Sequence, residues 1–144
     1  ANSTGEYLDY DIPGEALTDE KFANMIKEAE KYLGYPYVWG GSSPETSFDC
    51  SGFVSWVINH SNNGWNVGRL GANGLKNICD IIRPSEVKPG DLIFFQETYD
   101  TTGASHVGIY VGKGMMIHCG NPISYAHVNS SYWQEHFYCY GRLK

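Results

Sequence analysis

The pattern of apolar and polar positions changes along the chain, from helical spacing in the first half to alternation and short apolar runs in the second. Residues 1–17 show neither pattern and mix Ser, Thr, Gly, Asp and Glu, so we interpret them as a linker or tail. From Thr18 onward apolar residues recur at helical spacing, which predicts an amphipathic helix with Thr18 as its N-cap and Gly34 after its C-terminus. A second helix is predicted to begin at Cys50, with Asp49 as its N-cap.

The second half of the chain predicts an antiparallel sheet. The sequence Lys-Pro-Gly-Asp at 88–91 is typical of a β-turn, because Pro pre-sets the first central position and Gly tolerates the positive φ of the second. Strands are predicted after this turn at 92–95, 106–111, 115–119 and 137–141. The glycine-rich stretch 60–77 is predicted to be irregular apart from one short helix that ends near Cys79. Helices followed by an antiparallel sheet indicate an α+β domain over residues 18–144.

Two of the predicted strands form a hairpin whose register follows from its own apolar pattern, since a slip of one residue would turn every side chain to the other face. A turn centred on Lys113 makes one face wholly apolar, through the pairs Val107 with Cys119, Ile109 with Ile117, and Val111 with Met115. His106 and His118 then lie diagonally on the opposite face, where Gly108 and Gly120 add no bulk. We therefore predict that the two imidazoles meet. The other histidines are expected to be ordinary surface or core residues, and these are His60, His127 and His136.

Cys50 is the candidate nucleophile, because the partial positive charge and free N–H groups of a helix N-terminus stabilise a thiolate. Its polar neighbours Asp49 and Ser51 favour a surface position over the burial that is usual for cysteine. The other three cysteines are expected to be buried thiols. A disulfide between Cys119 and Cys139 is predicted only if the last strand adjoins the hairpin.

Composition and charge narrow the classes of function. The length of 144 residues and an apolar fraction of 42% fit one globular domain. Ten basic and sixteen acidic residues give a net charge of -6, which argues against a nucleic-acid partner. The longest apolar run, 92–95, is far shorter than the roughly 18 residues of a membrane span. The chain begins with Ala1 without a signal-peptide pattern, so we expect a mature or excised segment.

Five short motifs occur in order along the chain. They are YVWGG at 37–41, FDCSG at 48–52, KPGDL at 88–92, SHVGIY at 105–110 and IH at 117–118. Together they closely resemble the NlpC family of bacterial cell-wall endopeptidases, and the resemblance extends from about Phe22 to the C-terminus. It implies a papain-like α+β fold and a cysteine peptidase that hydrolyses peptidoglycan stem peptides, usually at the γ-D-glutamyl bond to a diamino acid.

The resemblance also implies roles for particular residues. By position, Cys50 matches the family's nucleophile, His106 its general base, and His118 the third polar residue that orients this base. Tyr37 matches the tyrosine of the family's oxyanion hole. Three further positions match residues that line the family's substrate groove: Trp39, Asp49 and Ser51. Many relatives carry an Arg-Thr-Ser-like element where this chain has Arg69 followed by Leu, Gly and Ala, so a hydroxyl that could contact the stem peptide is missing.

Three other interpretations are open at this point. The first is a zinc site, for which the side chains of four residues are suitable ligands: Cys50, His106, His118 and Cys119. The predicted register turns Cys119 away from His118, and the chain has no Cys-x-x-Cys pair, so we expect no metal and no cofactor. An amidase or acyltransferase would use the same Cys-His pair. A non-catalytic module would bind wall peptides through its Tyr and Trp surface.

The expected location is outside the bacterial cell, secreted or associated with the wall, and the expected state is a monomer. Anionic wall polymers would repel a domain of net charge -6, so retention on the wall requires something else. Together with the linker-like residues 1–17, this predicts an additional wall-directed domain on the N-terminal side.

Overall fold

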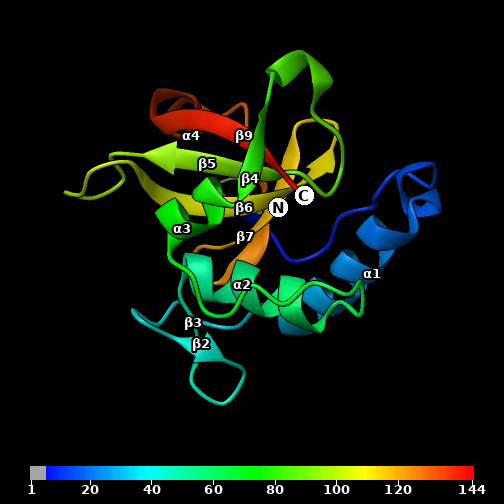
Figure 1. Ribbon diagram of the computed structural model, residues 1–144, viewed down its shortest axis with the longest axis horizontal. Coiled ribbons are helices and arrows are strands. Elements are labelled where there is room, and N and C mark those ends of the chain that lie inside the picture. Colours follow the sequence, from blue (N-terminus) through cyan, green and yellow to red (C-terminus); the bar gives the residue numbers. More distant parts are fainter. Residues whose placement is uncertain (1–5) are drawn as a thin grey trace.

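A seven-stranded antiparallel sheet lies at the centre of the computed structural model, which describes residues 6–144 (Figure 1). Its strand order is β1-β8-β7-β6-β5-β9-β4, and each neighbouring pair is antiparallel. The strands are β1 (Glu6–Tyr7), β4 (Cys79–Ile82), β5 (Leu92–Gln96), β6 (Ala104–Gly112), β7 (Met115–Cys119), β8 (Ile123–His127) and β9 (Phe137–Leu143). A separate two-stranded sheet consists of β2 (Ser42–Ser43) and β3 (Ser47–Phe48).

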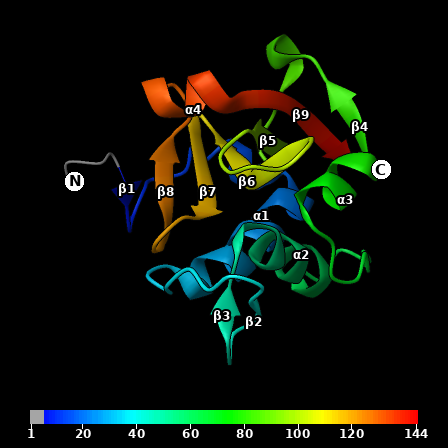
Figure 2. The same cartoon turned by 90° about the vertical axis from the view of Figure 1, so that its left-hand side faces the viewer.

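Helices cover both faces of the large sheet. The helices are α1 (Glu20–Ala29), α2 (Cys50–His60), α3 (Ala72–Asn77) and α4 (Ser131–His136), with 3₁₀ turns η1 (Ala16–Thr18), η2 (Glu30–Tyr32) and η3 (Pro84–Glu86). The main core lies between α1, α2, α3 and one face, while α4 lies on the other side of the strands (Figure 2). The predicted α+β fold, with N-terminal helices packed on an antiparallel sheet, is confirmed. Within residues 6–144, none of the helices combines the length and apolar character needed to cross a lipid bilayer.

The capping residues explain where the first two helices begin. As predicted, Asp49 caps α2, because its Oδ1 accepts a hydrogen bond of 2.8 Å from the Gly52 N–H. The prediction for α1 is wrong by one residue, since Asp19 rather than Thr18 caps it and accepts from the Phe22 N–H at 3.2 Å. A carboxylate there also complements the positive end of the helix dipole, which a threonine hydroxyl does not.

The β6–β7 hairpin has the predicted register over most of its length. Gly108 pairs with His118, and Ile109 pairs with Ile117. The predicted pair of Val111 with Met115 is wrong, because a bulge places Gly112 opposite Met115 instead. The three turn residues 112–114 all have positive φ, and the bulge accommodates the extra residue that this turn requires.

Several elements were not predicted from the sequence, namely β1, β2, β3, β4, β8 and α4. Each is two to six residues long and lacks a clear period, so its structure depends on what it packs against. The predicted turn at 88–91 and the strand after it are confirmed, with Gly90 at φ 98°. The condition for a disulfide between Cys119 and Cys139 fails, because β6 and β5 separate β7 from β9, and all four cysteines are free.

Part of the predicted linker packs on the domain. Residues 1–5 lie outside the described part of the chain. Tyr7 pairs with Tyr125 of β8, and the Tyr10 ring lies 5.4 Å from the ring of the same tyrosine. This segment is therefore joined to the sheet at Tyr7 and Tyr10 rather than free, because the two tyrosines pack on β8.

Gly52 is the glycine of α2 that allows the loop at Gly41 to approach the start of the helix. A Cβ at Gly52 would lie 2.0 Å from the Gly41 carbonyl oxygen. We expect Gly52→Ala to lower the free energy of unfolding by about 2 kcal/mol or more, because backbone must move to relieve this overlap. Urea denaturation measures the change. Gly74→Ala is the matched control within α3, where the nearest atoms to the Cβ belong to the Leu70 side chain at 3.3 Å, and an unchanged or higher stability is expected. Equal stability of the two variants would contradict this account.

Candidate active site

Cys50 is the first residue of α2, and its side chain lies against β6 beside His106. The thiol is 6% exposed and donates to the Ser105 carbonyl oxygen, with Sγ and oxygen 3.8 Å apart. The backbone N–H of Val107 also interacts with the sulfur. The sulfur therefore contacts the backbone on both sides of His106, which brings together two residues that are 56 positions apart.

The two predicted imidazoles meet across the hairpin. His106 Nε2 and His118 Nδ1 are hydrogen bonded at 2.8 Å, and the ring planes are nearly perpendicular at 81°. Both glycines leave room for this contact. A Cβ at Gly108 would lie 3.1 Å from the His118 Cβ, and one at Gly120 would lie 3.0 Å from the His118 Cε1. The predicted meeting of the rings is confirmed.

Burial controls the charge of the three groups. It raises the pKa of the Cys50 thiol to about 11, with a further contribution from the Asp49 carboxylate. It lowers the pKa of His106 to about 4, against a smaller opposing effect of Asp49. The pKa of His118 also lies below its ordinary value, because of burial and the neighbouring His106. Burial therefore disfavours the thiolate that the helix N-terminus led us to expect, and it favours a neutral thiol beside two neutral imidazoles.

A cavity of about 290 Å³ opens in front of the thiol. Its lining includes Cys50 and the four other residues expected around the substrate: Tyr37, Trp39, Asp49 and Ser51. The two histidines are not part of this lining, but Ser105, the neighbour of His106, is. Trp39 is 70% exposed and its ring lies edge-on to Tyr99 at 5.3 Å, so two aromatic rings stand at the mouth of the cavity.

Asp49 joins three parts of the site through its carboxylate. Besides capping α2, it accepts from the Gly40 N–H at 3.0 Å and from the Arg69 guanidinium, whose Nη2 lies 2.9 Å from both oxygens. The Nη1 of Arg69 also donates to the Ser51 hydroxyl at 2.9 Å. Asp49 and Ser51 are thus held in place by Arg69, a contact that nothing in the local sequence pattern predicts.

The other histidines have ordinary partners, as expected. The Nδ1 atoms of His60 and His136 are bonded to backbone oxygens of Trp56 and Gln96 at 2.9 Å, and the exposed His127 packs on Tyr7. In the described residues no three His, Cys, Asp or Glu side chains come together as metal ligands.

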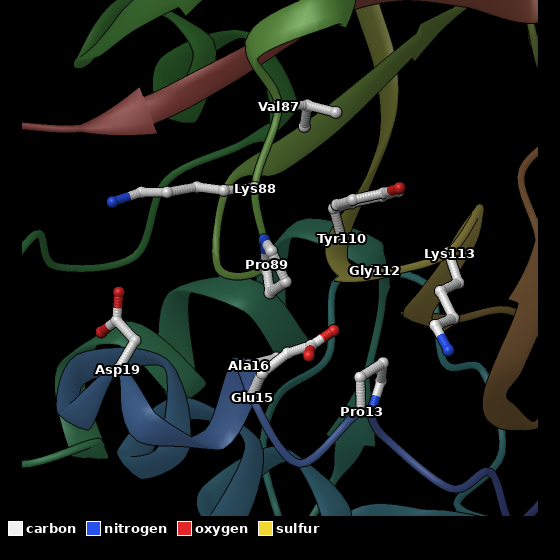
Figure 3. A pocket seen from close by; sticks show the side chains of 10 residues that line it. All are labelled: Pro13, Glu15, Ala16, Asp19, Val87, Lys88, Pro89, Tyr110, Gly112 and Lys113. Carbon is white, nitrogen blue, oxygen red and sulfur yellow. The ribbon is translucent and has the colours of Figure 1, made fainter.

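A second cavity, of about 420 Å³, lies away from these residues, between the segment from Pro13 to Asp19, the Lys88–Pro89 turn and the hairpin turn (Figure 3). Lys88 and Lys113 extend from its walls in different directions rather than toward one point (Figure 3). It contains none of the predicted site residues.

Comparison with known proteins identifies similar sequences and structures. The bifunctional muramidase/DL-endopeptidase CwlT of Bacillus subtilis is 42% identical over 124 residues, which cover 85% of this chain and 37% of CwlT. The gamma-DL-glutamyl hydrolase of the same organism is 36% identical over 122 residues, which cover 77% of this chain and 27% of that protein. The chain thus spans about a third of the length of the first relative and about a quarter of the length of the second.

A crystal structure of a lipoprotein-like protein of the NLP/P60 family from Staphylococcus aureus superposes with a TM-score of 0.82 at 36% identity. The superposition covers 99% of this chain and 45% of that one. The model of the NlpC/P60 family matches residues 34–142, which include the thiol and both imidazoles. The chain therefore belongs to the NlpC/P60 family.

Proposed function

We propose that this chain is a peptidoglycan hydrolase, a cysteine endopeptidase that cleaves stem peptides at the γ-D-glutamyl bond to a diamino acid. The observation that carries the proposal is the Cys50 thiol at the start of α2, beside a histidine that is hydrogen bonded to a second histidine. The names of the relatives support the type of bond, since one is a DL-endopeptidase and the other a gamma-DL-glutamyl hydrolase.

The reaction begins from a neutral thiol and a neutral imidazole. As the Cys50 sulfur attacks the substrate carbonyl, its proton passes to Nδ1 of His106, and a tetrahedral oxyanion forms. The His106 imidazolium then gives this proton to the leaving nitrogen, so that the amide bond breaks and a thioester remains. Water attacks the thioester with His106 as the base, and the proton finally returns to the sulfur. The Cys50 backbone N–H and the Tyr37 hydroxyl are the proposed donors to the oxyanion.

His118 serves as the orienting residue in this scheme. For Nδ1 of His106 to accept the thiol proton, its Nε2 must carry the hydrogen that is donated to Nδ1 of His118. Burial and the neighbouring ring keep the pKa of His118 below its ordinary value, so it stays a neutral acceptor when His106 becomes charged. A carboxylate in the place of His118 would stabilise this charge more strongly.

Substitution of the three proposed catalytic residues tests the function directly. We expect Cys50→Ala and His106→Ala to reduce the release of peptides from purified peptidoglycan by at least about a thousandfold, because nucleophile or base is lost. His118→Ala keeps both and should leave weak residual activity. Mass spectrometry of the released fragments identifies the cleaved bond. His60→Ala, an exposed histidine with its own partner, is the matched control and should retain activity. Turnover by Cys50→Ala, or loss of wild-type turnover in EDTA, would contradict the mechanism.

The pH profile tests the proposed resting state. Because burial lowers the pKa of His106 to about 4, this residue should remain a neutral base well below pH 6.5. We expect kcat/KM to fall on the acid side near pH 4. The free energy of unfolding should also decrease as the pH falls from 6.5 to 4, because His106 binds a proton in the unfolded chain over this range but not in the folded chain. Circular dichroism at each pH separates unfolding from titration. An acid limb near pH 6.5 in folded protein would contradict a buried neutral base.

We also propose that the chain is the catalytic module of a longer monomeric protein that is secreted or wall-associated, with a wall-directed domain on its N-terminal side. The greater length of the relatives and the net charge of -6 support this. In pull-downs with purified cell walls at low salt, we expect this chain to bind at least about tenfold more weakly than the longer protein. Equal binding of the two would contradict the proposal.

A further inference from the structure

Trp133 of α4 lies directly over the two histidines. Its indole is nearly parallel to the His106 ring, with centroids 5.0 Å apart and planes inclined by 22°. The same indole meets the His118 ring at 87°, with centroids 5.2 Å apart. One aromatic side chain therefore contacts both members of the hydrogen-bonded pair, from the face of the sheet opposite the main core.

The indole is itself held in place by its surroundings. The Phe95 ring of β5 packs against it at 4.5 Å, and the Tyr132 ring at 4.8 Å. The helix is fixed to the sheet by two hydrogen bonds, from Gln134 Nε2 to the Val128 carbonyl at 2.7 Å and between His136 Nδ1 and the Gln96 carbonyl at 2.9 Å. These contacts come from β5, α4 and the end of β8, so the position of the indole does not depend on the histidines alone.

The histidine pair needs such a cover for a physical reason. Its hydrogen bond joins two neutral rings, which is weaker than a bond to a charged group and for which water competes readily. His118 Nε2 is buried and has no hydrogen-bond partner among the described residues, so this bond is the one polar contact that fixes the His118 ring. Apolar surface that excludes water therefore strengthens the hydrogen bond that orients His106.

We propose that Trp133 is a positioning residue for the proposed hydrolysis, whose indole keeps water from the His106–His118 hydrogen bond and fixes the plane of the His106 ring. The inference rests on the proposed function for its catalytic consequence. Its structural part, a dry and fixed histidine pair, stands on the ring contacts alone.

Loss of the indole changes access of water to His106 without removing a charge. The titratable groups around His106 are His118 on β7 and Cys50 and Asp49 at the start of α2. On α4, the titratable His136 is bonded to the Gln96 carbonyl, and Glu135 is exposed. From β5, the contact to His106 is the Phe95 ring. A change in the titration of His106 on substitution of Trp133 therefore reports solvent access.

The test combines nuclear magnetic resonance with kinetics. In ¹⁵N-histidine-labelled Trp133→Leu, water reaches the ring, so we expect the pKa of His106 to rise by about one unit toward its ordinary value. We expect kcat to fall about tenfold to a hundredfold while KM stays within about threefold. Trp133→Phe retains a flat ring over His106 and should keep kcat within about threefold. Trp65→Leu is the matched control, since this indole packs beside Lys21 and should leave both quantities unchanged.

The outcomes separate the possible roles. A lower melting temperature with unchanged His106 titration and kcat would make Trp133 purely structural and overturn the inference, and so would a rise in KM alone. If Trp133→Leu does not fold, Trp133→Met supplies the same readout, because it keeps apolar contact but no flat ring. The titration requires no turnover, so inactivity of the wild-type chain would refute the proposed function while leaving this test intact.

Discussion

The candidate site depends on one hydrogen bond, between Nε2 of His106 and Nδ1 of His118. The bond exists because the β6–β7 hairpin has a single register that buries its apolar face, and this register places the two rings diagonally on the other face. Gly108 leaves the space that the rings occupy. The start of α2 then brings a thiol to the backbone beside His106. Fold and chemistry are thus connected through the pairing of two short strands.

Burial has two consequences that act together. It excludes water from the bonded rings, and it makes the charged forms of thiol and imidazole unfavourable, so the pKa of Cys50 rises and that of His106 falls. Both shifts favour the proton on the sulfur, which is the starting state of the proposed mechanism. Charge is confined to the rim, where Asp49 and Arg69 form an ion pair that fixes the loop at Gly40 and the first turn of α2. Burial thus favours neutral forms of the thiol and imidazole at the proposed reaction centre, while the charged pair at the rim holds the backbone around it.

The sequence predicts those features that are determined locally. The cap at Asp49, the turn at 88–91 and the hairpin register each follow from a few neighbouring residues, and the register alone is enough to predict the histidine pair. The features that depend on distant packing were not predicted. The contact of Arg69 with Asp49 spans 20 residues, and α4, which carries Trp133, is a six-residue helix without a period. The raised pKa of the Cys50 thiol was not predicted for the same reason, since burial is a property of the whole fold.

The position of one proton tests the central claim most directly. In ¹⁵N-labelled protein at neutral pH, a coupling across the hydrogen bond between the two rings identifies which nitrogen carries the hydrogen. The account predicts that the proton is on Nε2 of His106, shared with Nδ1 of His118, and that Nδ1 of His106 is unprotonated and available to the thiol. A proton on Nδ1 of His106, or no coupling between the rings, would contradict it.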